Sequence, residues 1–377
     1  MLAAKVLSRL LALISMQNIK IDHIAKSEGH MGFVAHILKG DVESARLEIH
    51  EGSRLIEGLL IGRQYDEAPI ITSRICGLCP IVHNICSLKA VENAFNIKIS
   101  RQTKVLRRLL LYAQIIQSHT LHLFMLSEDR TILLIRDWIN NFLEVLAGRA
   151  IHPLTTMIGG FRKLPDENLL KKLMREHTKI LDVADKLIAK HKNQPDFCRK
   201  TEYRALKSIY GNGPEIMPAE IQDGVIKRTT NTYMVGPIAR LHLYKNYEHD
   251  LMVPCYNIFY NIYAQAVEIA YYLAKIKKML PKEFKESNIK FKIKAGKGAV
   301  ACEAPRGTLY HAYEIDKNGK IINANIITPT AQFLNNLEAD LKEYLKDKWS
   351  APACRQSREK AKDLIRAYDP CISCAVH

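Results

Sequence analysis

The chain has 377 residues, 47% of them hydrophobic and 25% charged, a composition typical of a soluble globular protein with a large core. Its nine cysteines are an odd number without a repeating spacing, which argues against a secreted disulfide framework. The net charge of +16 does not indicate nucleic-acid binding, because no nucleic-acid motif accompanies the lysine-rich stretch 275–297. We interpret the basic residues as a solvated face or a contact with an acidic partner.

Residues 1–15 are mostly apolar, but this stretch is too short to span a bilayer. No small-residue cleavage site of a signal peptide stands out in it. We interpret it as a loose amphipathic extension, or as the result of a start codon assigned too early, since Met16 opens a better-patterned sequence. We therefore expect an uncertain extension over 1–15, a single domain over 16–377, and no membrane span.

Short strands are expected before the helices begin. The pattern over 19–49 suits strands, and residues 32–38 and 43–49 can pair across a turn at Lys39-Gly40-Asp41. Ser53 is then expected to be a helix N-cap. A small antiparallel sheet near the N-terminus follows from this pattern.

Helical periodicity dominates the rest of the chain. The predicted helices cover residues 80–95, 102–126, 131–147, 167–192, 247–279, 331–346 and 356–367. Two late strands, 308–315 and 321–327, flank Lys317-Asn318-Gly319, which is a good hairpin turn. We therefore predict an α+β fold that is mainly α, with a large helical core and small β elements near the N-terminus and before the C-terminal helices.

Two Cys-x-x-Cys pairs stand near opposite ends of the chain, at Cys76 and Cys79 and at Cys371 and Cys374. A chain terminus is normally the least ordered part of a domain, so thiols placed there make sense if a metal centre draws them into the interior. Four soft thiolates favour zinc, an iron–sulfur cluster or another transition metal. A structural zinc site is the simplest interpretation, although its cysteine pairs usually lie much closer together in sequence.

The two cysteine motifs resemble those of the large, catalytic subunit of nickel–iron hydrogenases. Arg-x-Cys-Gly-x-Cys-x-x-x-His is matched from Arg74 to His83, and Asp-Pro-Cys-x-x-Cys-x-x-His from Asp369 to His377. Weaker matches, in the family's order, are Glu28–His30, Gly148–Pro153, Val235–Pro237 with Arg240, Ala304–Gly307 and Thr328–Thr330. Gln117-Ser118-His119 replaces the His-Asp-His of many membrane-bound members. The chain is therefore more similar to the cytoplasmic, multi-subunit members, which include the deazaflavin-reducing enzymes of methanogens.

The resemblance implies that Cys76 and Cys371 are terminal nickel ligands. It implies that Cys79 and Cys374 bridge nickel to an iron that carries carbon monoxide and cyanide. The activity would be the heterolytic cleavage or formation of hydrogen, with Cys371 as the base that takes the proton.

Other matched residues would surround this centre. Arg306 and Thr330 would donate hydrogen bonds to the cyanide ligands, and Arg306 would also lie over the open metal position. His83 and Asp369 would lie around the ligands and tune them. Glu28 would carry the proton away from the centre.

The family also implies a magnesium ion that pins the C-terminus beneath the active site. Its ligands would fall on Glu57, the backbone near Ile326 and His377. Without the resemblance, Glu57 would be interpreted as an exposed helix carboxylate.

No cysteine set remains for an iron–sulfur chain, so electrons would leave through an iron–sulfur small subunit and further electron-transfer subunits. Two alternatives stay open: a zinc-stapled scaffold, and a relative of the quinone-reactive subunit of respiratory complex I, against which the retained cysteines argue. His119 and His122 are interpreted as packing residues or as neighbours of the site. The other cysteines are expected to be small buried hydrophobes, namely Cys86, Cys198, Cys255, Cys302 and Cys354.

Overall fold

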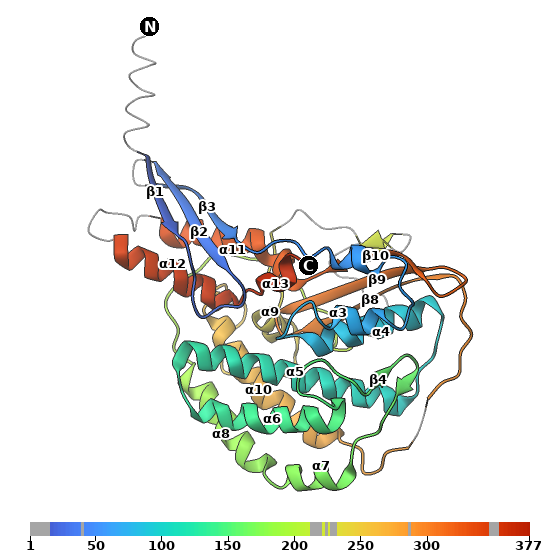
Figure 1. Ribbon diagram of the computed structural model, residues 1–377. Helices are drawn as coiled ribbons and strands as arrows, with labels where there is room; N and C mark the ends of the chain where they lie inside the picture. The colour runs from blue at the N-terminus through green and yellow to red at the C-terminus, as the bar shows by residue number, and fades with distance from the viewer. Residues whose placement is uncertain are drawn as a thin grey trace.

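The structure is a computed structural model that describes residues 16–38, 41–211, 221–222, 225–226, 232–285, 288–346 and 354–377. Its core consists of long helices packed side by side (Figure 1). They are α4 (Pro80–Ala94), α5 (Arg101–Ser127), α6 (Thr131–Ala147), α8 (His177–Lys190) and α10 (Tyr260–Met279). Small sheets flank this core, so the predicted α+β, mainly α class is confirmed.

Helix α5 runs through the middle of the core and contacts both α6 and α10. The Ser100 hydroxyl caps it by accepting a hydrogen bond from the Thr103 N–H, and Glu128 ends it in the left-handed conformation. Among the described residues, α5 alone is long and apolar enough to cross a membrane, but 72% of its most apolar stretch is buried inside the protein. Such burial is typical of a helix in the core of a protein.

The N-terminal sheet contains β1 (Met16–Ile21), β2 (Met31–Leu38) and β3 (Asp41–Ile49), all antiparallel. The two predicted strands are confirmed as β2 and β3, while residues 39 and 40 of the turn lie outside the described residues. Strand β3 packs against α11 (Pro329–Leu345). Helix α13 (Ile372–Ala375) lies between this sheet and β10 (Figure 1).

The second sheet has the order β10 (Ile321–Ile327), β9 (Gly307–Ile315) and β8 (Gly296–Ala304). The hairpin of β9 and β10 was predicted, but β8 was not. Its Gly-Lys-Gly start is typical of a loop in sequence, yet a Cβ at Gly298 would lie 2.1 Å from the Ala90 carbonyl oxygen. Glycine there lets α4 lie directly on the strand.

Three predictions about helices were wrong. The predicted helix 167–192 is two helices, α7 (Glu167–Met174) and α8, because the backbone turns after Met174, where the Glu176 N–H bonds to the Leu173 carbonyl at 3.2 Å. The predicted helix 247–279 begins only at Tyr260, after Pro254, which lacks an N–H. Ser53 caps no helix, since α2 (Ile56–Leu60) starts after Leu55 without a side-chain cap.

The remaining elements are short, except for α12 (Cys354–Tyr368). They are α3 (Ala68–Thr72), α9 (Pro237–Leu243), β4 (Thr156–Met157), β5 (Gly160–Phe161), β6 (Ile221–Gln222) and β7 (Val225–Ile226). The loop after α3 carries the first cysteine pair, and the segment after α12, which includes α13, carries the second; both lead into the interior.

Candidate metal centre

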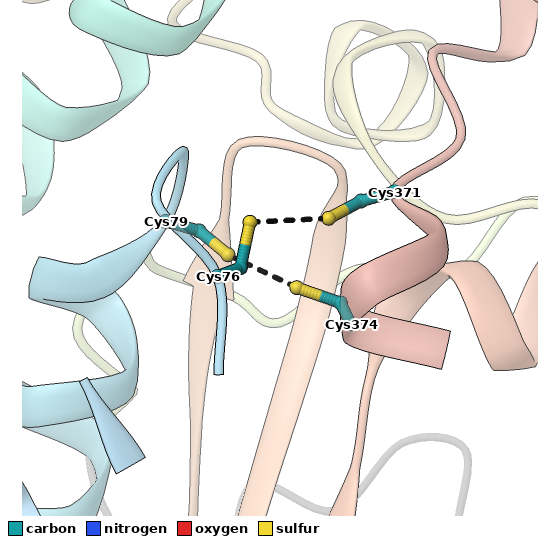
Figure 2. Close-up of side chains that lie close together, drawn as sticks. All are labelled: Cys76, Cys79, Cys371 and Cys374. Atoms are coloured by element: carbon teal, nitrogen blue, oxygen red, sulfur yellow. Dashed lines mark hydrogen bonds between the residues drawn. The ribbon is translucent and has the colours of Figure 1, made fainter. Parts of the chain in front are cut away.

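The two cysteine pairs meet in the protein interior, as Figure 2 shows. Sγ of Cys76 lies 3.3 Å from Sγ of Cys371, and Sγ of Cys79 lies 3.2 Å from Sγ of Cys374. All four sulfur atoms lie within 4.8 Å of one another, and all four residues are buried. Residues at opposite ends of the chain therefore form one compact sulfur site.

Local structure fixes the direction of each thiol. Cys79 is the N-cap of α4 and Cys371 is the N-cap of α13, so both pairs lie where a chain segment turns into a helix. The Leu78 N–H donates to Sγ of Cys76 at 3.2 Å, and the Cys371 N–H donates to the Thr330 hydroxyl at 3.0 Å. The thiols are thus held in place by backbone groups and by a side chain of α11.

Arg306 supplies the positive charge beside the sulfur atoms. It is 5% exposed, and its Nε and Nη2 donate to the Asp369 carbonyl and carboxylate at 2.7 and 2.9 Å, while Nη1 donates to the Ser118 hydroxyl at 3.2 Å. Burial alone would lower the pKa of Arg306, but the Asp369 carboxylate and the nearby thiolates raise this pKa well above its ordinary value. The guanidinium therefore stays charged inside the site.

The thiols differ in acidity. Hydrogen bonds from the neighbouring thiols, Cys371 first, lower the pKa of Cys76, whereas burial raises the pKa of Cys371 and of Cys374. If all four were thiolates, Arg306 alone would leave an excess of negative charge in the interior, which is costly. A metal cation bound by soft sulfur ligands removes that excess, so these residues fit a transition-metal centre.

Glu28 contacts the second cysteine motif from the N-terminal segment. Its carbonyl accepts from the Ile372 N–H at 3.3 Å, and its Oε2 accepts from the Ser373 N–H at 3.0 Å. The Ser373 hydroxyl also hydrogen-bonds to Oε1 of Glu28. The predicted proton carrier therefore lies against the ligand-bearing helix.

The predicted magnesium ligands also lie together. Nε2 of His377 lies 3.6 Å from Oε1 of Glu57 and 3.2 Å from the Ile326 carbonyl oxygen. Burial acts to raise the pKa of Glu57, but His377 and the Ile326 N–H outweigh it and lower this pKa. A side-chain carboxylate, a backbone carbonyl and an imidazole thus converge from three separate parts of the chain.

His83 continues from the sulfur site into a buried polar chain. Its Nε2 lies 3.7 Å from Sγ of Cys374, and its Nδ1 lies 3.2 Å from Nε2 of His311. Nδ1 of His311 then lies 2.7 Å from the Tyr313 hydroxyl. Burial lowers the pKa of His83 to about 3, so this imidazole is neutral. The sequence assigned no role to His311 or Tyr313, and only their place in β9 brings these residues to the site.

Arg240 lies behind the turn that carries Arg306. It is fully buried, pairs with Glu268 and Glu303 at 2.6 and 2.7 Å, and donates to the carbonyls of Ala304 and Pro305, each at 3.0 Å. Nothing in the sequence marked Glu268, because it follows the ordinary helical pattern of α10. The Arg240 side chain thus fixes the backbone just before Arg306.

Some predictions for the other histidines and cysteines were correct and others were wrong. Nε2 of His119 hydrogen-bonds to Glu268 at 2.8 Å, and Nδ1 of His122 to Gln265 at 2.7 Å, so both are buried packing partners. Cys86 and Cys302 are buried as predicted. The prediction was wrong for Cys198, which is exposed, and for Cys255, which is half-buried. The Cys354 side chain lies outside the described residues.

A cavity of about 170 Å³ opens beside the sulfur site. Glu28, Leu78, Ser118, Arg306 and Asp369 are among its lining residues. It is large enough for a diatomic gas. The arrangement therefore suits a metal centre that acts on a very small molecule.

Comparison with known proteins agrees with this geometry. The family described as nickel-dependent hydrogenase matches residues 54–140 and 258–377. The sulfhydrogenase 1 alpha subunit of Pyrococcus furiosus is 30% identical over 421 residues, covering 95% of this chain and 97% of that protein. The coenzyme F420 hydrogenase alpha subunit of Methanothermobacter thermautotrophicus is 27% identical over 417 residues, covering 96% and 95%. An NAD+-reducing [NiFe]-hydrogenase in the H2-reduced state has the same fold, with a TM-score of 0.81, 21% identity, and coverage of 96% of this chain and 99% of that one.

The chain belongs to the nickel-dependent hydrogenase family. It is a catalytic large subunit with a four-cysteine metal site, and the resemblance inferred from its motifs is confirmed. Membership of this family decides against the two alternative interpretations, a zinc-stapled scaffold and a relative of the complex I subunit.

Proposed function

We propose that the four cysteines hold a nickel–iron centre at which hydrogen is split into protons and electrons, or formed from them. The observation that carries this proposal is the meeting of four buried sulfur atoms, all within 4.8 Å, beside a buried arginine. Cys76 and Cys371 would be the terminal nickel ligands. Cys79 and Cys374 would bridge to an iron carrying carbon monoxide and cyanide. Such a centre, when bound, supplies a Lewis-acidic, redox-active site that polarises hydrogen.

The protein's own residues would then orient the reactants and move the proton. Arg306 directs a fixed positive charge into the pocket, and Thr330 holds the Cys371 backbone. Cys371 would accept the proton released from hydrogen, and Glu28 would take it onward, since the Glu28 backbone and carboxylate both contact the segment 371–373. Asp369 and His83 would fix Arg306 and Cys374 respectively.

We further propose that Glu57, the Ile326 carbonyl and His377 bind a magnesium ion. Oxygen ligands from a carboxylate and a carbonyl suit this hard cation. The short distances from Nε2 of His377 to Oε1 of Glu57 and to the Ile326 carbonyl oxygen, 3.6 and 3.2 Å, support the idea. Such an ion would anchor the segment that carries Cys371 and Cys374.

Electrons would leave through an iron–sulfur small subunit that docks near Cys76. Two residues beside Cys76 in the first motif, Arg74 and Gly77, are exposed, so the sulfur site comes close to the surface there. Ile70 and Leu154 expose 47% and 50% of their surface and line a cavity of about 250 Å³ together with Arg74. Exposed apolar side chains around a cavity favour a protein partner.

We also propose that the assembled enzyme contains further electron-transfer subunits and works in the cytoplasm. The support is the similarity of its motifs to cytoplasmic, multi-subunit hydrogenases, and its relatives are named as alpha subunits.

The experiment is metal analysis of the purified complex together with infrared spectra of the carbon monoxide and cyanide stretching region. Cys371→Ser should lose nickel and activity, because serine is a much poorer ligand for soft metals. Cys198→Ser, at an exposed cysteine, is the matched control and should keep both. Stoichiometric zinc without nickel in the active complex would contradict the proposal.

A further inference from the structure

A second carboxylate, that of Glu51, contacts the C-terminal helix directly after β3 ends. Its Oε2 lies 3.3 Å from the Ser373 hydroxyl, which also hydrogen-bonds to Oε1 of Glu28. Its Oε1 accepts a hydrogen bond from the His30 N–H at 2.8 Å. One serine hydroxyl therefore joins two carboxyl groups, both of them on partly exposed residues.

This geometry suits proton transfer better than static packing. A serine hydroxyl has one proton, so it can donate to only one of two carboxylates at a time. If Glu28 is protonated, it can donate to the Ser373 oxygen while Ser373 donates to Glu51. When both protons shift together, Glu28 becomes ionised, Glu51 becomes protonated and the serine is unchanged. Only O–H bonds break and form, and no electrons move.

Gly29 makes the close approach of Glu51 possible. It has a φ of +86°, and a Cβ there would lie 2.9 Å from Oε1 of Glu51 and 2.6 Å from Cβ of Ile372. Any side chain at this position would push Glu51 and the C-terminal helix apart. Glycine is thus required between Glu28 and His30 for the two carboxylates to share one hydroxyl.

Three exposed histidines form a cluster next to the chain segment that carries Glu51. The rings of His23 and His30 lie 5.2 Å apart between centroids, and those of His30 and His50 lie 5.1 Å apart. His50 directly precedes Glu51, and the His30 backbone bonds to it. Imidazoles exchange protons readily near neutral pH, so such a cluster can pass protons between a carboxylate and water.

We propose that Glu51 receives the proton from Glu28 through the Ser373 hydroxyl, and that the histidine cluster of His23, His30 and His50 passes it to water. The inference rests on the proposed role of Glu28 and extends that route to the surface. It assigns Glu51 and the histidine cluster to proton exit during hydrogen oxidation and to proton entry during hydrogen formation.

The test is Glu51→Gln in the complete enzyme complex. Glutamine keeps the shape and can still accept from the His30 N–H, but it cannot carry the proton. We expect hydrogen oxidation and hydrogen–deuterium exchange with water to fall on the order of tenfold or more, with unchanged carbon monoxide and cyanide infrared bands. Glu43→Gln, at an exposed carboxylate on the preceding strand β3, should leave all three measurements unchanged.

A separate experiment tests the role of the histidine cluster. Replacing His23, His30 and His50 with alanine should slow turnover in dilute buffer, and added free imidazole should restore it, because a soluble proton carrier substitutes for the missing rings. All three residues are exposed, so the replacement should leave the fold intact. Unchanged turnover of this variant in dilute buffer would overturn the role of the cluster.

The outcomes separate this inference from the proposed function. Wild-type isotope exchange in Glu51→Gln, alongside its loss in Glu28→Gln, would overturn the role of Glu51 and leave that of Glu28 intact. Wild-type exchange in Glu28→Gln would instead overturn the proposed proton route at its first step. If Glu51→Gln fails to assemble the metal centre, Ser373→Ala removes the hydroxyl but keeps the N–H bond to Glu28. Normal infrared bands with wild-type exchange in that variant would likewise overturn the inference.

Discussion

At the scale of single residues, Arg306 combines a buried charge with a fixed direction. Its planar guanidinium donates to both the carbonyl and the carboxylate of Asp369 and to the Ser118 hydroxyl. A lysine ammonium in the same place would keep the charge but could not match this fork of donors. Replacing Arg306 with lysine therefore tests the direction of the hydrogen bonds separately from the positive charge.

Arg306→Lys should leave nickel and iron content unchanged and lower hydrogen turnover roughly a hundredfold, the usual cost of misplacing one electrostatic group in an active site. The measurements are metal analysis and hydrogen-dependent dye reduction on the same preparation. Arg101→Lys, at an exposed position at the start of α5, is the control. If Arg306→Lys turned over at the wild-type rate, the arginine would have only a structural role.

At the scale of elements, the turn between β8 and β9 is held from behind by α9. Arg240 on α9 bonds to the two carbonyls before Arg306, while Glu268 on α10 and Glu303 on β8 neutralise it. Gly236 completes the contact, since a Cβ there would lie 2.7 Å from the Arg306 carbonyl oxygen. Three elements thus determine where the Arg306 side chain points.

Arg240→Lys should therefore act at two levels. A lysine cannot make all of these hydrogen bonds, so buried carboxylates lose partners and the free energy of unfolding should fall by about 3 kcal/mol or more. Arg306 should also shift, which would move the infrared bands of the diatomic ligands in the fraction that still folds. Denaturant unfolding and infrared spectra check the two effects. Stability loss with wild-type bands would show that Arg240 supports the fold alone.

The elements also show what sequence can and cannot predict. Periodicity identified α5 and α6 and the hairpin of β9 and β10, because their patterns reflect which face is buried. It missed β8, whose glycines are explained only by the α4 backbone lying on them. It merged α7 and α8, because both have the same helical periodicity and the turn between them at residues 175 and 176 contains neither glycine nor proline. Each error arose at a place where the pattern of residues close together in sequence does not determine the structure.

At the scale of the whole molecule, the site brings together two segments that lie far apart in sequence, one with Cys76 and one with Cys371. Cys76 and Cys371 are 295 residues apart in sequence, and no spacing rule predicts their 3.3 Å contact. Their motifs allowed the meeting to be expected through the family resemblance, and Glu57 and His377 were expected together in the same way. Glu51 matches no motif and the sequence assigned His311 no role, so only the folded structure brings them to the site.

The last residues should therefore matter to the whole fold. The Val376 carbonyl accepts from the Arg54 N–H at 3.1 Å, and His377 bonds to the carbonyls of Cys374 and Ile326 at 2.6 and 3.2 Å. Deleting Val376 and His377 removes all of these contacts while leaving every cysteine in place. We expect loss of nickel, loss of the diatomic infrared bands and a lower melting temperature.

A finer variant separates the proposed magnesium ion from packing. His377→Gln keeps a polar side chain of moderate size but replaces the imidazole, so it should weaken the centre less than the deletion does. Chelation of magnesium should then destabilise the wild-type complex, measured as a fall in melting temperature, and have little effect on the deletion variant. A deletion variant that retained full nickel and wild-type turnover would show that Cys371 and Cys374 are held by α13 alone, without help from the end of the chain.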